Sequence, residues 1–221
     1  MNVAKPGLAR FLILLLGLTI SGWSAANDAR PAGTPEPSAK TLLLVARPGL
    51  NEPFAGAVVA VGTLGGNRHL GVIMNRPIGV TLDQLIPQKK QESVLAPRRE
   101  VNLGGPEMLN VLFAVVRSDS RPDASGIALS KDLFLVGEAV TVDSLIVRDA
   151  PEARYFVGLT MWDEGELMTE VSQGMWTLVS IDTNELLNDP APSSIWERLR
   201  IESAHAPLTA RFHRWVDPGQ I

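Results

Sequence analysis

Four acidic side chains in one short stretch have the clearest chemical potential in this sequence: Asp163, Glu164, Glu166 and Glu170. Glu166 and Glu170 are four residues apart, so in a helix they lie on one face. Two carboxylates on one face can hold a divalent cation or act as general acid and base. No histidine is close in the sequence, however, and acidic residues are favoured at a helix N-terminus in any case. We therefore favour a structural role for this acidic cluster, with a metal-dependent or carboxylate-using hydrolase as the alternative.

Two turn motifs contain groups that could bind an anion. Their residues are Asn75, Arg76, Pro77, Gly104, Gly105 and Pro106. An arginine can pair with an anion, and successive N–H groups of a glycine turn can form an anion-binding nest. The glycine turn lacks the lysine and the spacing of a P-loop, and single surface arginines more often make structural ion pairs. We therefore expect both motifs to be turns that the fold needs.

The remaining motifs predict no reaction centre. Trp162 and Trp176 are expected to be core aromatics, and Gly165 belongs to a turn that leads into a helix. The chain has no cysteine, and its three histidines match no standard metal motif. It also lacks the G-x-S-x-G, dinucleotide-binding and H-E-x-x-H patterns. We assign no catalytic residue, no metal ligand and no cofactor.

The elements that must position these residues are strands and short helices. Nearly continuous apolar runs bounded by glycine or proline predict strands over residues 41–47, 57–64, 69–75, 112–117, 133–136, 155–160 and 176–181. Apolar residues at helical spacing predict short helices over residues 81–86, 141–147, 166–173 and 193–203. This irregular alternation predicts an α+β fold with a mixed sheet rather than a repeated βαβ winding.

Residues 1–26 have the order of a secretory signal peptide. Lys5 and Arg10 precede the apolar run Phe11–Ile20, and small residues follow up to Ala26. The run is shorter than the roughly 20 residues that a membrane span needs. We therefore expect cleavage after Ala26 and a periplasmic or secreted protein. An uncleaved N-terminal membrane anchor is the alternative.

The rest of the chain divides into three parts. Residues 27–39 contain three prolines and almost no large apolar side chain, which is typical of a flexible linker. The main domain is expected over residues 40–203, and residues 204–221 form a C-terminal extension. Between Ala210 and Val216 this extension mixes aromatic and basic side chains. It could contact a partner or cover the domain's own apolar surface.

Charge argues against nucleic acid as a partner. Loss of Lys5 and Arg10 with the signal peptide changes the formal net charge from −4 to −6, because the removed part has no acidic residue. Phosphate binding needs clustered lysine and arginine. We therefore expect no nucleic-acid partner, and membrane contact only through an uncleaved signal.

Taken in order, several segments resemble the YqgE/AlgH family. They are LLLVARP near the start of the domain, GVIMNRP, LGGP, WDEGEL, GMW and WER in the last predicted helix. The resemblance covers about residues 40–202 and implies a mixed, largely antiparallel sheet curled into a half-barrel, with short helices packed on it. It implies no established catalytic activity. The family-motif positions, structural or binding, are Asn75, Arg76, Pro77, Gly104, Gly105, Pro106, Trp162, Gly165 and Trp176.

These observations together predict an exported, non-catalytic binding or regulatory protein of the YqgE/AlgH type. Its partner is expected to be an envelope protein or a polymer, and the sequence gives no oligomeric state. One branch of the family is described as a regulator of alginate production. Transcriptional regulation of exopolysaccharide production is therefore a further alternative, which the acidic charge and the export signal oppose.

Overall fold

The computed structural model describes residues 40–86, 97–188 and 194–204. The predicted signal peptide, the linker and the C-terminal extension after Ala204 lie outside these residues. Within them, no helix has the length and apolar character needed to cross a membrane. The strands are β1 (Lys40–Ala46), β2 (Val58–Leu64), β3 (Arg68–Ile73), β4 (Pro77–Thr81), β5 (Glu100–Leu103), β6 (Glu107–Arg117), β7 (Ile127–Ala128), β8 (Leu133–Val136), β9 (Ala153–Trp162) and β10 (Trp176–Asp182). The helices are α1 (Leu82–Leu85), α2 (Ala139–Val147), α3 (Glu166–Ser172), α4 (Thr183–Asn188) and α5 (Ile195–Ala204).

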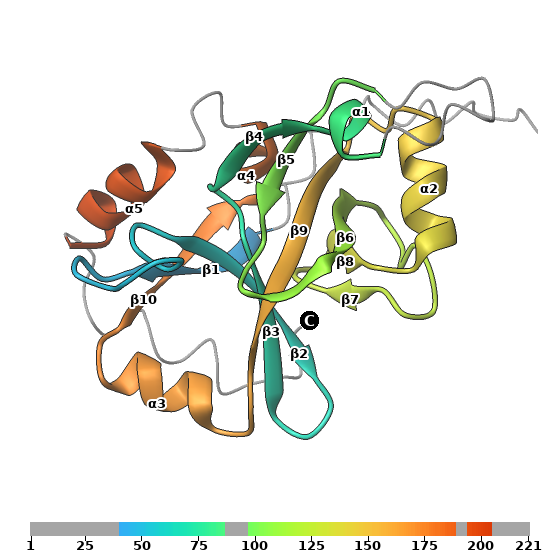
Figure 1. The fold of residues 1–221 in the computed structure, drawn as a ribbon. Helices are drawn as coiled ribbons and strands as arrows, with labels where there is room; N and C mark the ends of the chain where they lie inside the picture. Colours follow the sequence, from blue (N-terminus) through green and yellow to red (C-terminus); the bar gives the residue numbers. More distant parts are fainter. Residues whose placement is uncertain (1–39, 87–96, 189–193, 205–221) are drawn as a thin grey trace, which may run out of the picture. The chain divides into compact units, whose positions relative to one another are not determined.

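The strands form one ten-stranded sheet in which β9 is the central strand (Figure 1). The sheet path runs β10-β1-β2-β3-β9-β6-β8-β7, while β4 pairs with β5, and β5 pairs with β9. Every pairing is antiparallel except the parallel pairing of β5 with β9. The predicted α+β class with a largely antiparallel sheet is therefore confirmed.

The half-barrel that the resemblance implied is not what the structure shows. The sheet is neither closed nor strongly curled, because β10 and β7, the two ends of the path, do not pair with each other in the described part of the chain. In addition, β5 takes part of an edge of β9 and extends the sheet sideways through β4. The result is a branched sheet rather than a curled one.

Buried side chains form three clusters on the two faces of this sheet. The large core includes Phe156 and lies under α4 and α5, which contribute residues such as Ile195. On the other face, the α2 cluster packs Tyr155 under α1 and α2. The tryptophan cluster, on that same second face, packs Trp162 and Leu167 under α3. The helices thus cover the second face at two separate places, which matters for the surface between them.

Gly158 changes the phase of β9 in the middle of the strand. Its φ of 71° is a conformation that glycine adopts without steric cost. Before it, Phe156 faces the large core; after it, Leu159 does, so the alternation of side chains shifts by one residue. The same edge of β9 pairs with β5 before Gly158 and with β3 after it.

Gly104 and Gly105, which follow β5, lie against the backbone of β9 at this point. The Gly104 N–H donates to the Val157 carbonyl oxygen, and the Gly104 carbonyl oxygen accepts from the Ile73 N–H, both at 2.8 Å. A Cβ at Gly104 would lie 2.2 Å from the Gly158 carbonyl oxygen, and one at Gly105 2.2 Å from the Leu159 carbonyl. The two glycines are therefore required because β5, β3 and β9 come too close here for any side chain.

We predict that Gly104→Ala lowers the free energy of unfolding by about 2–3 kcal/mol, because the added methyl group must push β5 away from β9. Equilibrium unfolding in urea measures this loss. Gly65→Ala is the matched control, since no described atom lies within 4 Å of the position its Cβ would take. This control should change the free energy of unfolding by less than about 0.5 kcal/mol. We call the close approach of Gly104 and Gly105 to Gly158 the glycine crossing. Equal losses in the two variants would contradict its role in stability.

Candidate functional site

Asn75 joins two turns through its side chain. Its Oδ1 accepts a hydrogen bond from the Val58 N–H, and its Nδ2 donates to the Gly56 carbonyl oxygen, both at 2.9 Å. The residue is buried. Buried backbone groups need such partners, so the amide side chain completes the hydrogen bonding of the segment before β2.

Arg76 ties the same segment to the start of β4. Its Nη1 donates to the Glu52 carboxylate at 2.6 Å, and its Nη2 donates to the carbonyl oxygens of Pro53 and Ala55 at 3.1 and 2.5 Å. Pro77 then begins β4, where it has no N–H to leave unpaired. The guanidinium therefore binds a loop of its own chain, and the Gly104 N–H is likewise already bonded to Val157.

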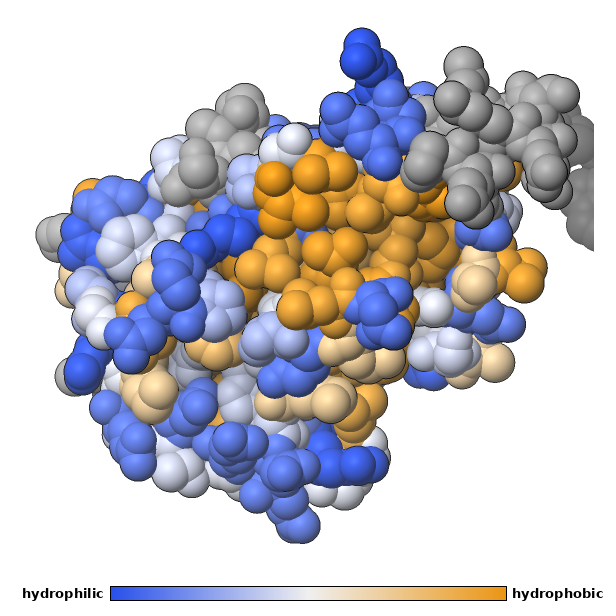
Figure 2. All heavy atoms as spheres, in the orientation of Figure 1, coloured by the Kyte–Doolittle hydropathy of each residue, from blue (hydrophilic) through white to orange (hydrophobic). Residues whose placement is uncertain are grey.

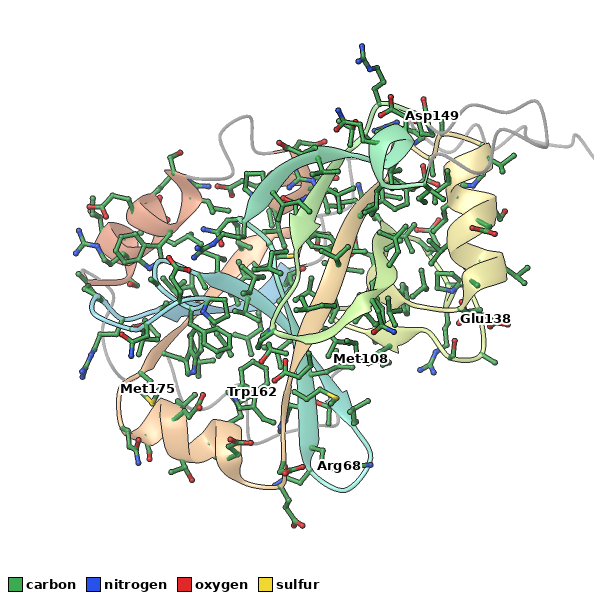
Figure 3. All side chains as sticks on the ribbon, viewed as in Figure 1. Arg68, Met108, Glu138, Asp149, Trp162 and Met175 are labelled. Carbon is green, nitrogen blue, oxygen red and sulfur yellow. The ribbon has the colours of Figure 1, made fainter. Side chains whose placement is uncertain are left out.

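Glu170 connects two tryptophans, Trp162 at the end of β9 and Trp176 at the start of β10. Its Oε2 accepts the indole N–H of Trp162 at 2.9 Å and that of Trp176 at 2.7 Å. The two indoles meet edge to face with their ring centroids 6.3 Å apart, and Phe54 packs on Trp176 in the same manner at 5.6 Å. The labelled Trp162 lies between the end of β9 and α3 (Figure 3). Glu170 thus fixes α3 to both β9 and β10.

The other three members of the acidic cluster lie on the exposed turn before and at the start of α3. Glu166 accepts the Asp163 N–H at 2.9 Å, which closes the turn before the helix, and Gly165 is the N-cap of α3 with a φ of 76°. Asp163 and Glu164 are exposed. The described residues contain no group of three or more histidine, cysteine or acidic side chains placed to hold a metal ion. Glu166 and Glu170 therefore have separate hydrogen-bond partners within the domain.

A pocket of about 270 Å³ lies away from all of these motifs. It is lined by residues of β2 and of the segment that contains β7: Val61, Thr63, Arg121, Ser125, Gly126, Ile127, Ala128, Leu129 and Ser130. Neither turn motif and no acidic cluster residue contributes to this lining. The family-motif residues are thus absent from the lining of this pocket.

A continuous apolar surface lies instead on the second face of the sheet, between its helix-covered parts (Figure 2). We name it the apolar face. Its most exposed members are Ile78, Leu85, Met108 and Leu109, at 37%, 40%, 47% and 57% relative exposure. Half-buried side chains continue it into the α2 cluster: Ile86, Leu103, Leu112 and Val157. Leu103 and Leu112 both pair with Val157, so these side chains adjoin across three strands.

An irregularity in β6 exposes part of the apolar face. Glu107 pairs with Leu159 and Leu112 pairs with Val157, so four residues of β6 stand opposite a single residue of β9. Met108 adopts a φ of 53°, which is uncommon for a residue other than glycine. The extra residues do not pair with β9. Leu109 covers Gly158, since its Cδ2 lies 3.0 Å from the position that a Cβ added at Gly158 would take. Figure 3 shows Met108 beside β6.

Sequence reasoning did not identify the apolar face. The predicted strand covered residues 112–117 only, although the run from Met108 to Leu112 is apolar except for Asn110. Nothing local in this run signals that a bulge turns its first residues out of the ladder. The positive φ of Met108 accompanies the bulge, and the neighbouring Glu107 and Leu109 lie against Gly158, some fifty residues later.

Burial affects two ionisable groups on β6 and β9. The Tyr155 hydroxyl is buried in the α2 cluster and has no hydrogen-bond partner among the described residues. Burial, which penalises the phenolate, raises the pKa of Tyr155 to about 12. Burial also raises the pKa of Glu107, whose Oε2 has no described partner, and the nearby Glu166 carboxylate adds to that rise.

The fold and these contacts define a class of α+β proteins with a branched, largely antiparallel sheet held at a glycine crossing. Two solved structures share this fold. The AlgH protein from Pseudomonas aeruginosa matches with a TM-score of 0.59 and 22% identity, over 80% of this chain and 94% of that one. A protein from Corynebacterium diphtheriae matches with a TM-score of 0.55 and 21% identity, over 77% and 88% of the two chains.

The chain belongs to the AlgH-like (DUF179) family, whose model matches residues 43–204. A UPF0301 protein of Chromohalobacter salexigens is 31% identical over 153 residues, which cover 67% of this chain and 83% of that protein. A UPF0301 protein of Pseudoalteromonas translucida is 25% identical over 160 residues, which cover 70% and 85%. The resemblance stated from the sequence motifs is therefore confirmed, while these names carry no activity to transfer.

We predict that Glu170→Ala lowers the free energy of unfolding by about 2–4 kcal/mol, because it leaves two indole N–H groups without their acceptor. Glu170→Gln keeps an acceptor oxygen and should lose less, about 1 kcal/mol. Glu164→Ala, an exposed neighbour in the same cluster, is the control and should be close to neutral. Urea unfolding followed by tryptophan fluorescence measures all three. A neutral Glu170→Ala would show that the two indole bonds do not hold α3.

We predict that Tyr155 titrates near pH 12 in the folded protein. It is the single tyrosine of the chain, so the rise in phenolate absorbance near 295 nm reports it alone. In the unfolded chain its pKa is about 10. Its contribution to stability is therefore complete below pH 10 and is lost as the pH rises from 10 to 12. Tyr155→Phe should remove the absorbance change and cost little stability, and a folded-state midpoint near 10 would contradict the buried hydroxyl.

Proposed function

We propose that this AlgH-like protein is a non-catalytic binding protein that works outside the cytoplasm and holds its partner on the apolar face. One observation carries this proposal. The polar side chains of the family motifs are occupied by bonds within the domain, while the apolar face exposes Ile78, Leu85, Met108 and Leu109. Large exposed apolar patches on folded proteins mark interaction sites.

The apolar face favours a protein partner over a polymer. Methionine and large aliphatic groups suit the desolvated centre of a protein interface, whereas a polysaccharide would bring hydroxyl groups that this surface cannot satisfy. The elements of the face also carry Asp83, Glu100 and Glu107. We therefore propose an amphipathic segment of an envelope protein, with basic residues flanking its apolar side chains.

The two alternatives have less support. In the described residues, 13 lysines and arginines stand against 19 aspartates and glutamates, which repels a nucleic-acid backbone. A carboxylate-using hydrolase needs acidic side chains that converge on one site, and no contact of Glu166 or Glu170 favours this. The proposal that the protein is exported is supported by the basic residues, the apolar run and the small residues that precede Asn27.

We predict that a photo-crosslinking residue at position 109 captures one envelope protein on irradiation in cells, whereas the same residue at position 201 does not. Ile201 is a matched control, because it is 48% exposed and lies on α5, which covers the large core on the first sheet face. The AlgH-like chain in the crosslinked product should begin at Asn27, because we expect the signal peptide to be cleaved after Ala26.

The captured protein must then bind the purified chain directly. Leu109→Glu should weaken that binding at least about tenfold, because a charge enters the centre of the apolar face, and Ile201→Glu should not. Identical adducts from positions 109 and 201, or equal binding by the two glutamate variants, would contradict the proposal. A chain recovered from the cytoplasm with Met1 intact would contradict the proposed address.

A further inference from the structure

We propose that the chain's own C-terminal segment, residues 208–216, docks on the apolar face and competes there with the partner. The inference rests on the proposed function, since it concerns the regulation of the same face. An apolar surface of this extent is costly to leave in water when no partner is bound. The segment is the part of this chain whose sequence best fits the need.

The apolar residues of this segment have the spacing of a docking peptide. Leu208, Phe212, Trp215 and Val216 stand at positions i, i+4, i+7 and i+8, which is the pattern of a single apolar stripe at helical spacing. Peptides of this pattern bind grooves and apolar faces through those anchors, and aromatic residues dominate the binding energy. The spacing thus matches a surface built from aliphatic and methionine side chains.

Charge complements the apolar match. The segment contains Arg211 and Arg214 and no acidic residue, whereas the described domain has an excess of acidic side chains.

The length of the extension is sufficient for docking within one chain. The described domain ends at Ala204, so Leu208 is four residues further on and Val216 is twelve. Residues 205–207 can place Leu208 up to about 14 Å from Ala204, and a helical segment 208–216 would extend about 12 Å further. A domain of this size has a radius of gyration of about 15 Å, so the segment can reach surface beyond α5. A tethered segment also has an effective concentration near the millimolar range, which makes modest affinity sufficient.

The test uses a fluorescein-labelled synthetic peptide of residues 205–221 and the purified full chain. Phe212→Glu combined with Trp215→Glu removes the two aromatic anchors of the tethered segment and frees the face. We expect the peptide to bind this double variant about 10- to 100-fold more tightly than it binds the unchanged chain. The matched control is Thr209→Glu combined with His213→Glu, which adds the same charge off the apolar stripe and should leave peptide binding as weak as in the unchanged chain. Fluorescence anisotropy measures the affinities.

Substitutions in the domain locate the binding site. Added to the double variant, Leu109→Glu should abolish peptide binding, and Ile201→Glu should leave it intact. Equal peptide binding by the unchanged chain and the double variant overturns the proposal. A dimer in sedimentation that Leu109→Glu dissolves also overturns it, because a second copy would then cover the face. If the peptide binds as expected but no partner is captured from position 109, the proposed function fails; the docking of the segment then stands, but its competition with a partner does not. If a partner is captured but the peptide does not bind, the proposed function stands and this inference fails.

Discussion

The close approach of three backbones at Gly104, Gly105 and Gly158 is the constraint on which the rest of the structure depends. It lets one edge of β9 serve β5 first and β3 afterwards, and it shifts the phase of β9 by one residue. The second sheet face is therefore divided into the α2 cluster and the tryptophan cluster, each with its own helices. Leu109 lies over the gap that the absent Cβ of Gly158 leaves, so the exposed apolar residues arise from the same crossing.

The polar residues of the family motifs serve this architecture through hydrogen bonds. Asn75 and Arg76 hold the segment before β2, while Glu166 and Glu170 hold the start and the inner side of α3. A buried or half-buried polar group that is fully hydrogen-bonded stabilises one arrangement of the chain, because every alternative leaves a donor or acceptor unpaired. The recurring motif residues can therefore be explained by folding alone, and the apolar face is the feature that folding does not explain.

Much of the fold could be predicted from local sequence, since the apolar runs located β1, β2, β3, β8 and β10 to within a residue or two, and helical spacing located α2, α3 and α5. β4, β5, β7 and α4 were missed. Pro77–Thr81 and Glu100–Leu103 are short, and they become strands only by pairing with each other and with β9. The acidic cluster was correctly placed at the start of a helix. Its indole partners could not be predicted, since Trp162 and Trp176 meet Glu170 only when β9 and β10 flank α3.

Glu170 has a consequence for how this end of the molecule comes apart. One carboxylate oxygen receives an N–H group from each of two strands that stand four neighbours apart in the sheet path. If either indole detaches, the Glu170 carboxylate loses one of its two indole donors. The hydrogen bond to the remaining indole is then held less firmly in place. The ends of β9 and β10 together with α3 therefore form one cooperative opening unit, and amide protons in all three should exchange with solvent at a common rate.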